Sequence, residues 1–248
     1  MPAFDGKICL VTGAARGIGA AIAEALAAGG ATTVVTDLDE AGAMAAAAAI
    51  GPPSLGMRLD ITDPGCVRDV LAQVRDRFGG LDILVNNAGW DKAGPFVDST
   101  PEEWDRIIAI NLMGPIRVIH AALPLLTARG RASIVNIGSD AGRVGSSGEA
   151  VYSAAKGGVI AFTKTLAREL ARYNVNVNCV CPGPTDTALF AEVVGENPKL
   201  RDGLIRAIPL RRLAEPAEVA ATVAFLASDA AAYLTGQTVS VSGGLTMC

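Results

Sequence analysis

The stretch KICLVTGAARGIG, residues 7–19, decides the fold of this chain. Residues 7–13 form a short apolar run that predicts a buried strand, and the helical pattern AIAEALAAGG follows at residues 21–30. Glycines in the turn between them let the backbone approach a pyrophosphate, whose negative charge the N–H groups and dipole at a helix start favour. Glycines also serve ordinary tight turns, but the strand before and the helix after predict a dinucleotide-binding turn.

The same alternation of apolar runs and helical patterns continues along the chain. Because strands that alternate with helices are joined by right-handed crossovers, we expect one α/β domain over residues 1–248, with a parallel sheet covered on both faces. Residues 184–213 interrupt the pattern with an irregular segment that is a candidate lid over the active site. Further strands are predicted at 31–37, 55–62, 81–89, 133–139, 175–183 and 237–244, and helices at 40–50, 64–79, 101–129 and 150–172.

Composition argues against several classes of protein. The net charge is −4, so no basic surface for nucleic acid or an anionic membrane is expected. The first residues do not resemble a signal peptide, and no run of about 18 apolar residues predicts a membrane span. One histidine, His120, lies in an apolar run and argues against a Ser/His/Asp hydrolase. The scattered cysteines predict free thiols in the cytoplasm and no metal site: Cys9, Cys66, Cys179, Cys181 and Cys248.

An acidic residue, Asp37, ends the second predicted strand. A carboxylate there can accept hydrogen bonds from the ribose hydroxyls of the adenosine half and repel a 2′-phosphate, which favours NAD over NADP. Asp37 can instead cap the helix that follows it. Arg16, in the glycine turn, could attract a 2′-phosphate, but we expect Asp37 to dominate because direct contact acts at shorter range.

These residues belong to a set of motifs that is similar to one known family. The chain resembles the short-chain dehydrogenases/reductases over nearly its whole length. The resemblance implies a Rossmann-like, doubly wound parallel sheet of seven strands in the order 3-2-1-4-5-6-7, and hydride transfer between a nicotinamide and an alcohol/ketone pair. The matching positions are TGAARGIG at 12–19, Asp60, NNAG at 86–89, Asn111, Ser139, YSAAK at 152–156, PG at 182–183 and Thr187.

The catalytic set that the resemblance implies is Asn111, Ser139, Tyr152 and Lys156. Tyrosine alone is a poor base at neutral pH, and a cation beside it would lower its pKa. Lys156 follows Tyr152 by one helical turn, so both side chains share a face, although such pairs are common on any amphipathic helix. Ser139, at the end of the fifth strand, can polarise the substrate oxygen. In the family, the asparagine holds a water that joins the lysine to solvent.

The resemblance also implies contacts with the cofactor after each strand. Asp60 could merely cap a turn, and Thr185 could likewise serve only a turn. The implied cofactor residues are Gly13, Arg16, Gly17, Ile18, Gly19, Asp37, Leu38, Asp60, Ile61, Asn87, Ala88, Gly89, Tyr152, Lys156, Pro182, Gly183, Thr185 and Thr187.

The substrate is expected to contact Ser139 and Tyr152, within walls formed by residues 90–92, 140–149 and 184–213. Trp90 and Phe190 offer apolar surface to it or pack internally. Arg143 could bind an anionic handle such as a CoA or carrier phosphate, or be a solvated charge.

Within the family, the chain is similar to dehydrogenases of hydroxyacyl-CoA thioesters, first of the 2-hydroxycyclohexanecarboxyl-CoA type. One alternative is a 3-oxoacyl-thioester reductase that uses NADPH, which would suit Arg16 but not Asp37. Another is a catalytically silent NAD(H)-binding scaffold, which the intact catalytic set argues against. The resemblance implies a cytoplasmic homotetramer with a small-molecule substrate.

Overall fold

The computed structural model describes residues 3–194 and 198–247 of the chain, and its seven strands form one parallel sheet. The strand order β3-β2-β1-β4-β5-β6-β7 confirms the predicted Rossmann-like topology. The order reverses between β1 and β4, and ligands of open α/β sheets bind outside the carboxyl ends of the strands at such a point. The strands are β1 (Ile8–Thr12), β2 (Thr32–Asp37), β3 (Leu55–Arg58), β4 (Ile83–Asn86), β5 (Ala132–Ile137), β6 (Val175–Pro182) and β7 (Thr238–Val241).

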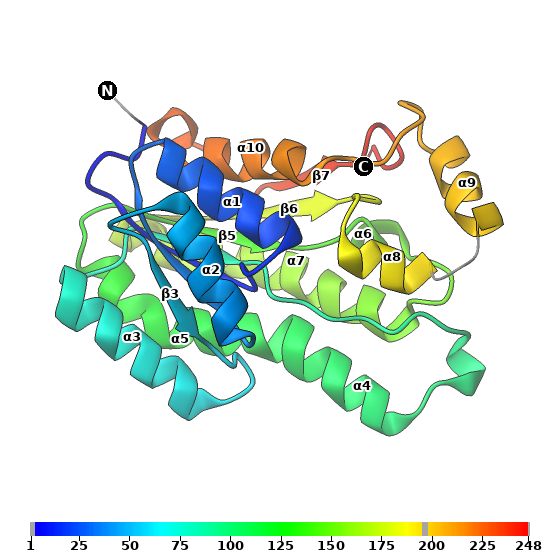
Figure 1. The fold of residues 1–248 in the computed structure, drawn as a ribbon, viewed down its shortest axis with the longest axis horizontal. Coiled ribbons are helices and arrows are strands. Elements are labelled where there is room, and N and C mark those ends of the chain that lie inside the picture. The colour runs from blue at the N-terminus through cyan, green and yellow to red at the C-terminus, as the bar shows by residue number, and fades with distance from the viewer. Residues whose placement is uncertain (1–2, 195–197, 248) are drawn as a thin grey trace.

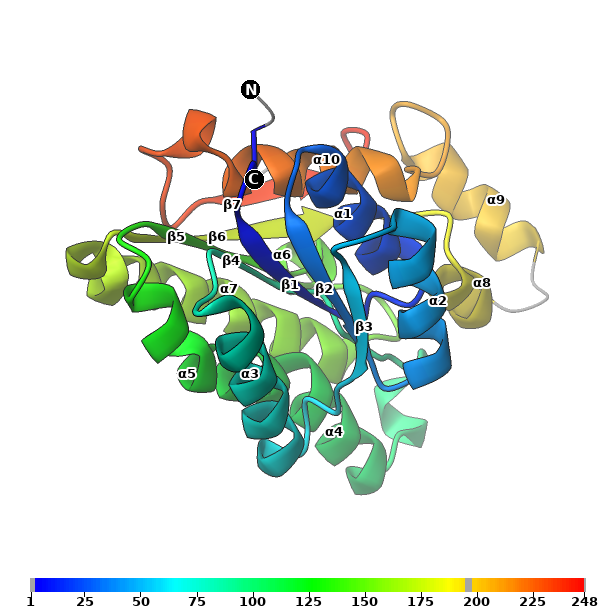
Figure 2. The same ribbon diagram turned by 60° about the vertical axis from the view of Figure 1, so that its left-hand side comes forward.

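Helices cover both faces of the sheet (Figures 1 and 2). One face carries α1 (Gly17–Ala28), α2 (Glu40–Ile50) and α10 (Pro216–Ala227). The other carries α3 (Pro64–Phe78), α5 (Gly114–Thr127) and α7 (Ala150–Leu170), with α4 (Pro101–Ile108) running into α5 through a π-helical turn, Ala109–Met113. Short helices follow the ends of β5 and β6: α6 (Ala141–Val144), α8 (Ala188–Val194) and α9 (Pro198–Ala207).

The core lies in two apolar layers, one on each face of the sheet. Strand β1 explains the division, because successive side chains of a strand point to opposite faces. Cys9 and Val11 pack with α1 and α10, whereas Leu10 packs with α3 and α5. A fully buried side chain of leucine size stabilises the fold by about 1.5–3 kcal/mol. Continuous apolar runs such as β1 are therefore what a sheet buried on both faces requires.

Polar side chains cap the starts of three helices, and the cap of α2 is Asp39 rather than Asp37. Asp39 caps α2 by accepting a hydrogen bond from the N–H of Gly42 at 3.1 Å, and Asp63 caps α3 by accepting one from Gly65 at 2.7 Å. Thr100 forms a capping box at the start of α4. Each cap satisfies an N–H group that the helix leaves free and contributes about 1 kcal/mol.

Three parts of the predicted organisation are wrong. Helix α10 was not expected, although Pro216 opens it. The segment 184–213 is not irregular, since it contains α8 and α9; its residues 195–197 lie outside the described part of the chain. The third strand ends at Arg58 rather than at residue 62.

The helical segment Pro101–Thr127 is long and apolar enough, by length and composition alone, to cross a membrane. Burial against the sheet explains that apolar composition instead. Val118, Ile119, Ala122 and Leu126 are buried in the layer that packs α5 against the sheet.

The cysteines that the structure describes, Cys9, Cys66, Cys179 and Cys181, are free thiols, and Cys248 lies outside the described residues. Within residues 3–194 and 198–247, no group of three or more His, Cys, Asp or Glu side chains is arranged to hold a metal ion.

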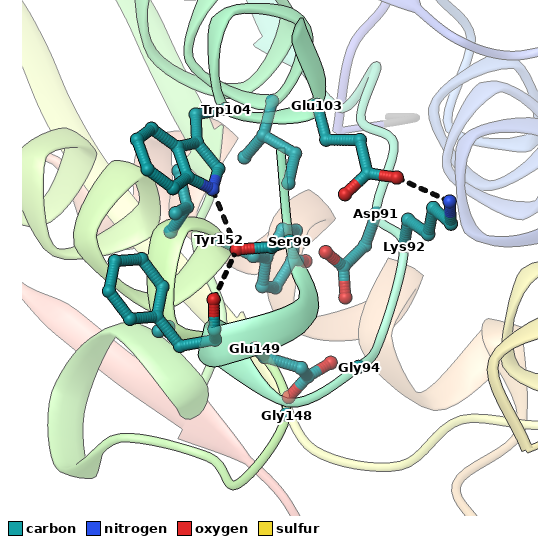
Figure 3. A pocket seen from close by; sticks show the side chains of 13 residues that line it. Asp91, Lys92, Gly94, Ser99, Glu103, Trp104, Gly148, Glu149 and Tyr152 are labelled. Atoms are coloured by element: carbon teal, nitrogen blue, oxygen red, sulfur yellow. Dashed lines mark hydrogen bonds and ion pairs between the residues drawn. The ribbon is translucent and has the colours of Figure 1, made fainter. Parts of the chain in front are cut away.

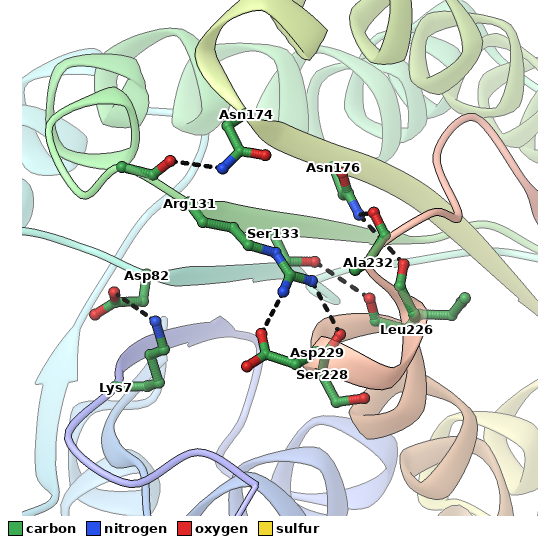
Figure 4. A network of polar contacts seen from close by, with 12 residues as sticks. Lys7, Asp82, Arg131, Ser133, Asn174, Asn176, Leu226, Ser228, Asp229 and Ala232 are labelled. Carbon is green, nitrogen blue, oxygen red and sulfur yellow. Dashed lines mark hydrogen bonds and ion pairs between the residues drawn. The ribbon is translucent and has the colours of Figure 1, made fainter.

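Charged side chains at the amino ends of the strands pair with one another (Figure 4). Asp82, just before β4, is buried and accepts a hydrogen bond from Arg129 at 3.0 Å, while Lys7 lies 3.5 Å away. Arg131, just before β5, forms an ion pair with Asp229. These contacts tie the starts of the central strands to the helices around them.

Candidate active site

The glycine turn lies where β1 ends, and its geometry tolerates only glycine at two places. Gly13 has a φ of 63°, and a Cβ there would lie 2.6 Å from the Cα of Ala88. A Cβ on Gly19 would collide with the carbonyl oxygen of Gly13. The missing side chains leave an open backbone cradle at the start of α1, which fits the pyrophosphate of a dinucleotide.

The end of β4 holds this turn in place. Asn87 donates hydrogen bonds from its side chain to the carbonyl oxygens of Thr12 at 3.0 Å and Gly13 at 2.8 Å. The Thr12 hydroxyl accepts hydrogen bonds from the N–H groups of Asn87 and Ala88 at 3.0 and 3.1 Å. The ends of β1 and β4 are thus bonded together at the switch point of the sheet.

The other expected cofactor residues also lie along the carboxyl edge of the sheet, with local roles of their own. The carboxylate of Asp60 accepts two hydrogen bonds from Thr62, at 2.9 Å from its N–H and 2.6 Å from its hydroxyl, so it caps a turn. Ile61 is buried in the core. Thr185 is buried and donates a hydrogen bond to Gly183 at 2.9 Å, and the Thr187 hydroxyl accepts one from Phe190 in α8.

Ser139, Tyr152 and Lys156 converge where β5 ends and α7 begins. The Lys156 ammonium donates a hydrogen bond to the carbonyl oxygen of Ile137 at 2.9 Å and lies 5.5 Å from the centre of the Tyr152 ring. The Ser139 hydroxyl is within hydrogen-bonding reach of Tyr152. Two hydroxyl groups and one ammonium group are thus gathered at one point beside the cofactor turn.

Asn111 joins this group from the π-helical turn between α4 and α5. Its side chain donates hydrogen bonds to the carbonyl oxygens of Trp90 at 2.6 Å and Ile107 at 3.0 Å, and accepts one from the Trp90 N–H at 3.3 Å. A Cβ on Gly89 would lie 3.0 Å from the Asn111 amide oxygen and 3.6 Å from the Lys156 ammonium. Single π-helical turns are frequent at functional sites, and this one places Asn111 beside Gly89.

Burial changes the proton affinities of the two titratable residues in this group. It lowers the pKa of Lys156 to about 8, because a buried ammonium loses its hydration. The pKa of Tyr152 is raised, first by burial and then by the charges of Glu149 and Asp91. This corrects the expectation of a lowered tyrosine pKa, since burial and the two carboxylates raise it.

A pocket lined by both polar and apolar side chains opens beside Tyr152 (Figure 3). Asp91 and Glu149 face it, and both fall in segments expected to line the substrate site, although the sequence assigned them no chemistry. No sequence motif predicts that these two residues line the same pocket, because they come from separate loops. The lining residues are Asp91, Lys92, Gly94, Phe96, Ser99, Glu103, Trp104, Ile107, Gly148, Glu149, Ala150, Val151 and Tyr152.

The three further residues expected to contact substrate are not among those that line this pocket in the described part of the chain. The Trp90 ring lies 3.9 Å below the guanidinium of Arg106, on α4. Arg143 is half-buried on α6, and Phe190 is half-buried on α8.

Comparison with known proteins identifies the family. Residues 13–246 match the family model described as enoyl-(acyl carrier protein) reductase. The 3-oxoacyl-(acyl-carrier-protein) reductases of Escherichia coli and Vibrio cholerae are 43% and 44% identical over 244 residues, which are 98% of this chain and 99% of each relative. Galactitol 2-dehydrogenase of Agrobacterium fabrum is 38% identical over 250 residues, covering 97% of this chain and 98% of that protein. The chain belongs to the short-chain dehydrogenase/reductase family. It is an oxidoreductase that transfers a hydride between a nicotinamide cofactor and a small-molecule alcohol or ketone.

The expected preference of this short-chain dehydrogenase/reductase for NAD is wrong. The 3-oxoacyl-(acyl-carrier-protein) reductases it resembles use NADPH. In the structure, the Asp37 carboxylate accepts hydrogen bonds from the N–H groups of Ala15 at 3.0 Å and Asp39 at 3.1 Å, which hold it against the turn. Arg16, in the same turn, and Leu38 are exposed, and an exposed arginine there can pair with a 2′-phosphate.

Proposed function

We propose that this protein is an NADPH-dependent reductase of 3-oxoacyl thioesters, in which Tyr152 donates the proton. The observation that carries the proposal is the convergence of Ser139, Tyr152 and Lys156 beside a glycine turn that fits a dinucleotide. The identity to 3-oxoacyl-(acyl-carrier-protein) reductases favours this substrate class over a 2-hydroxycyclohexanecarboxyl-CoA.

The proposed reaction divides the work between three side chains. Ser139 donates a hydrogen bond to the ketone oxygen of the substrate and polarises the carbonyl. Tyr152 gives its proton to the same oxygen, and its raised pKa keeps it protonated at neutral pH, as a proton donor requires. Lys156 stabilises the phenolate that remains. NADPH, when bound, supplies the hydride to the carbonyl carbon.

The rest of the proposed machinery positions the cofactor and the substrate. The backbone of the glycine turn would hold the pyrophosphate. Arg16 would bind the 2′-phosphate, because its side chain is exposed and could release Glu192, whose carboxylate lies 3.7 Å from its guanidinium, in favour of the phosphate. Asn111 would join Lys156 to solvent. Residues 184–213, with α8 and α9, would close over the substrate as a lid.

Several broader expectations remain proposals alongside this one. The protein would act as a single cytoplasmic domain and assemble as a homotetramer. The thioester could be carried by an acyl carrier protein or by CoA, and the scaffold alternative would show neither reaction. A substrate whose acyl chain extends beyond the pocket beside Tyr152 could also contact Trp90, Arg143 and Phe190.

The test measures the fall in NADPH absorbance with a 3-oxoacyl-CoA and a 3-oxoacyl-(acyl carrier protein). We expect turnover with NADPH, about 10³-fold loss in kcat for Tyr152→Phe, and little change for the matched control Tyr233→Phe, whose ring is exposed. Replacing Arg16 with alanine is expected to raise KM for NADPH but not for NADH. Near-full activity of Tyr152→Phe would contradict the proposed role, and absence of turnover by the wild type would contradict the substrate class.

A further inference from the structure

Asp91 is a buried acid beside the candidate active site. Its residue is 8% exposed, and among residues 3–194 and 198–247 neither carboxylate oxygen has a hydrogen-bond partner. It lies in the connection after β4 and faces the pocket beside Tyr152 (Figure 3). Leaving a charged group buried and unpartnered is strongly unfavourable, so such a group needs a chemical explanation.

The neighbour of Asp91 in the pocket is another acid, Glu149. Glu149 precedes the first residue of α7, three positions before Tyr152, and is half-buried. Two carboxylates in one site cannot both ionise easily, and a proton held between them forms a hydrogen bond that gives each a partner. Burial and the charge of Glu149 raise the pKa of Asp91 to about 7, so Asp91 is protonated in about half of the molecules at neutral pH.

The two lysines near Asp91 and Glu149 do not neutralise the charge of these acids. Lys92, next along the chain, has its ammonium bound to Glu103 at the start of α4. Lys156, on α7, attracts the Asp91 charge but is bonded to Ile137 behind the tyrosine. The group that faces the pair within the pocket is therefore Tyr152, whose pKa both acids raise.

We propose that Asp91 and Glu149 together hold one proton and return it to Tyr152 after each turnover. This inference rests on the proposed function of Tyr152 as the proton donor. In the reduction, the Tyr152 O–H bond breaks as an O–H bond forms on the substrate oxygen. The phenolate then takes the proton of the carboxyl pair across the pocket that all three residues line, and the pair regains a proton from water through Glu149.

The energetics favour this direction of transfer. A phenolate whose conjugate acid has a raised pKa takes a proton readily from a carboxylic acid that titrates near neutrality. The route also differs from the one through Asn111, whose side-chain amide already bonds the backbone of Trp90 and Ile107. Asp91 acts through Tyr152 and is therefore a positioning residue for the proton rather than a catalytic one.

The test compares kcat for ketone reduction between pH 6 and pH 9 in the wild type, Asp91→Asn, Glu149→Gln and the double variant. Wild-type kcat is expected to fall as pH rises through about 7, where the pair loses its proton. Each single variant should lose this step and show kcat about tenfold lower at pH 6.5, with KM for the ketone within about twofold. The double variant should be no slower than the singles, because the pair acts as a unit.

Asp98→Asn is the matched control, because Asp98 is an exposed acid in the same connection, and it should keep the wild-type profile. Thermal melts check folding; if Asp91→Asn does not fold, the half-buried Glu149→Gln carries the test. An unchanged profile in the single variants, or a double variant whose loss equals the product of the single losses, would overturn the proposal. The profile is measured with any ketone that the protein reduces, so a wrong thioester assignment and a wrong proton route give separate results.

Discussion

Two buried acids at opposite ends of the sheet, Asp82 and Asp91, differ in the groups that surround them. At the amino ends, buried Asp82 accepts hydrogen bonds from the Ile8 N–H and from Arg129. Arg131 pairs there with Asp229, as Figure 4 shows. At the carboxyl ends, Asp91 has no such partner within the described residues (Figure 3). Polar groups that are satisfied within the protein stabilise it, whereas groups left unsatisfied at a pocket remain available for chemistry. The two ends should therefore respond differently to mutation.

The largest expected effect lies at the carboxyl end and leaves the fold intact. Lys156→Met removes a buried ammonium but keeps most of its packing, so kcat should fall by about 10³-fold while the free energy of unfolding changes by less than about 2 kcal/mol. Steady-state kinetics and urea unfolding measure the two quantities on one preparation. A variant that loses stability in proportion to activity would contradict a purely catalytic role for Lys156.

The converse is expected at the amino end for Asp82→Ala. The change leaves the Ile8 N–H and the half-buried Arg129 without their acceptor and should lower the free energy of unfolding by about 3 kcal/mol. The kcat/KM of the folded variant, measured well below its melting temperature, should stay within about twofold of the wild type. A tenfold loss of activity in the folded variant would show that the two ends are coupled.

The smallest effect should come from Arg131→Ala, which removes an ion pair at the same end of the sheet as Asp82. Its partner Asp229 is mostly exposed, so the pair is screened by solvent and the loss should be below about 1 kcal/mol. Urea unfolding at low and high salt checks this, because a screened pair contributes little at either. A loss as large as that of Asp82→Ala would mean that burial of the acid is not what separates the two pairs.

Local sequence signals were sufficient for much of the fold. Strand β1 is a continuous apolar run, and Thr100-Pro101 marks the start of α4, so both could be recognised from neighbouring residues. Helix α10 was missed because almost every residue of it is apolar or small, which removes the polar–apolar period of a surface helix. Its start signal, Glu215-Pro216 followed by Glu218, was nevertheless in the sequence.

The site was less predictable because its properties depend on distant residues. The resemblance brought Ser139, Tyr152 and Lys156 into one group, since they belong to two neighbouring motifs. The direction of the Tyr152 pKa shift was wrong, because it depends on burial and on Asp91, which comes from another loop. The NAD preference predicted from Asp37 was also wrong, and in the structure the Asp37 carboxylate accepts hydrogen bonds from the backbone N–H groups of Ala15 and Asp39.

The bonds between Thr12 and Asn87 have a consequence for how a cofactor would arrive. Because these residues already fix the turn after β1 to the end of β4, little chain ordering is left for the moment of association. Ordering flexible segments usually subtracts from affinity, so a preorganised cradle keeps more of the contact energy. Asn87→Ala should loosen this cradle and raise the dissociation rate constant of the dinucleotide, while its association rate constant changes little.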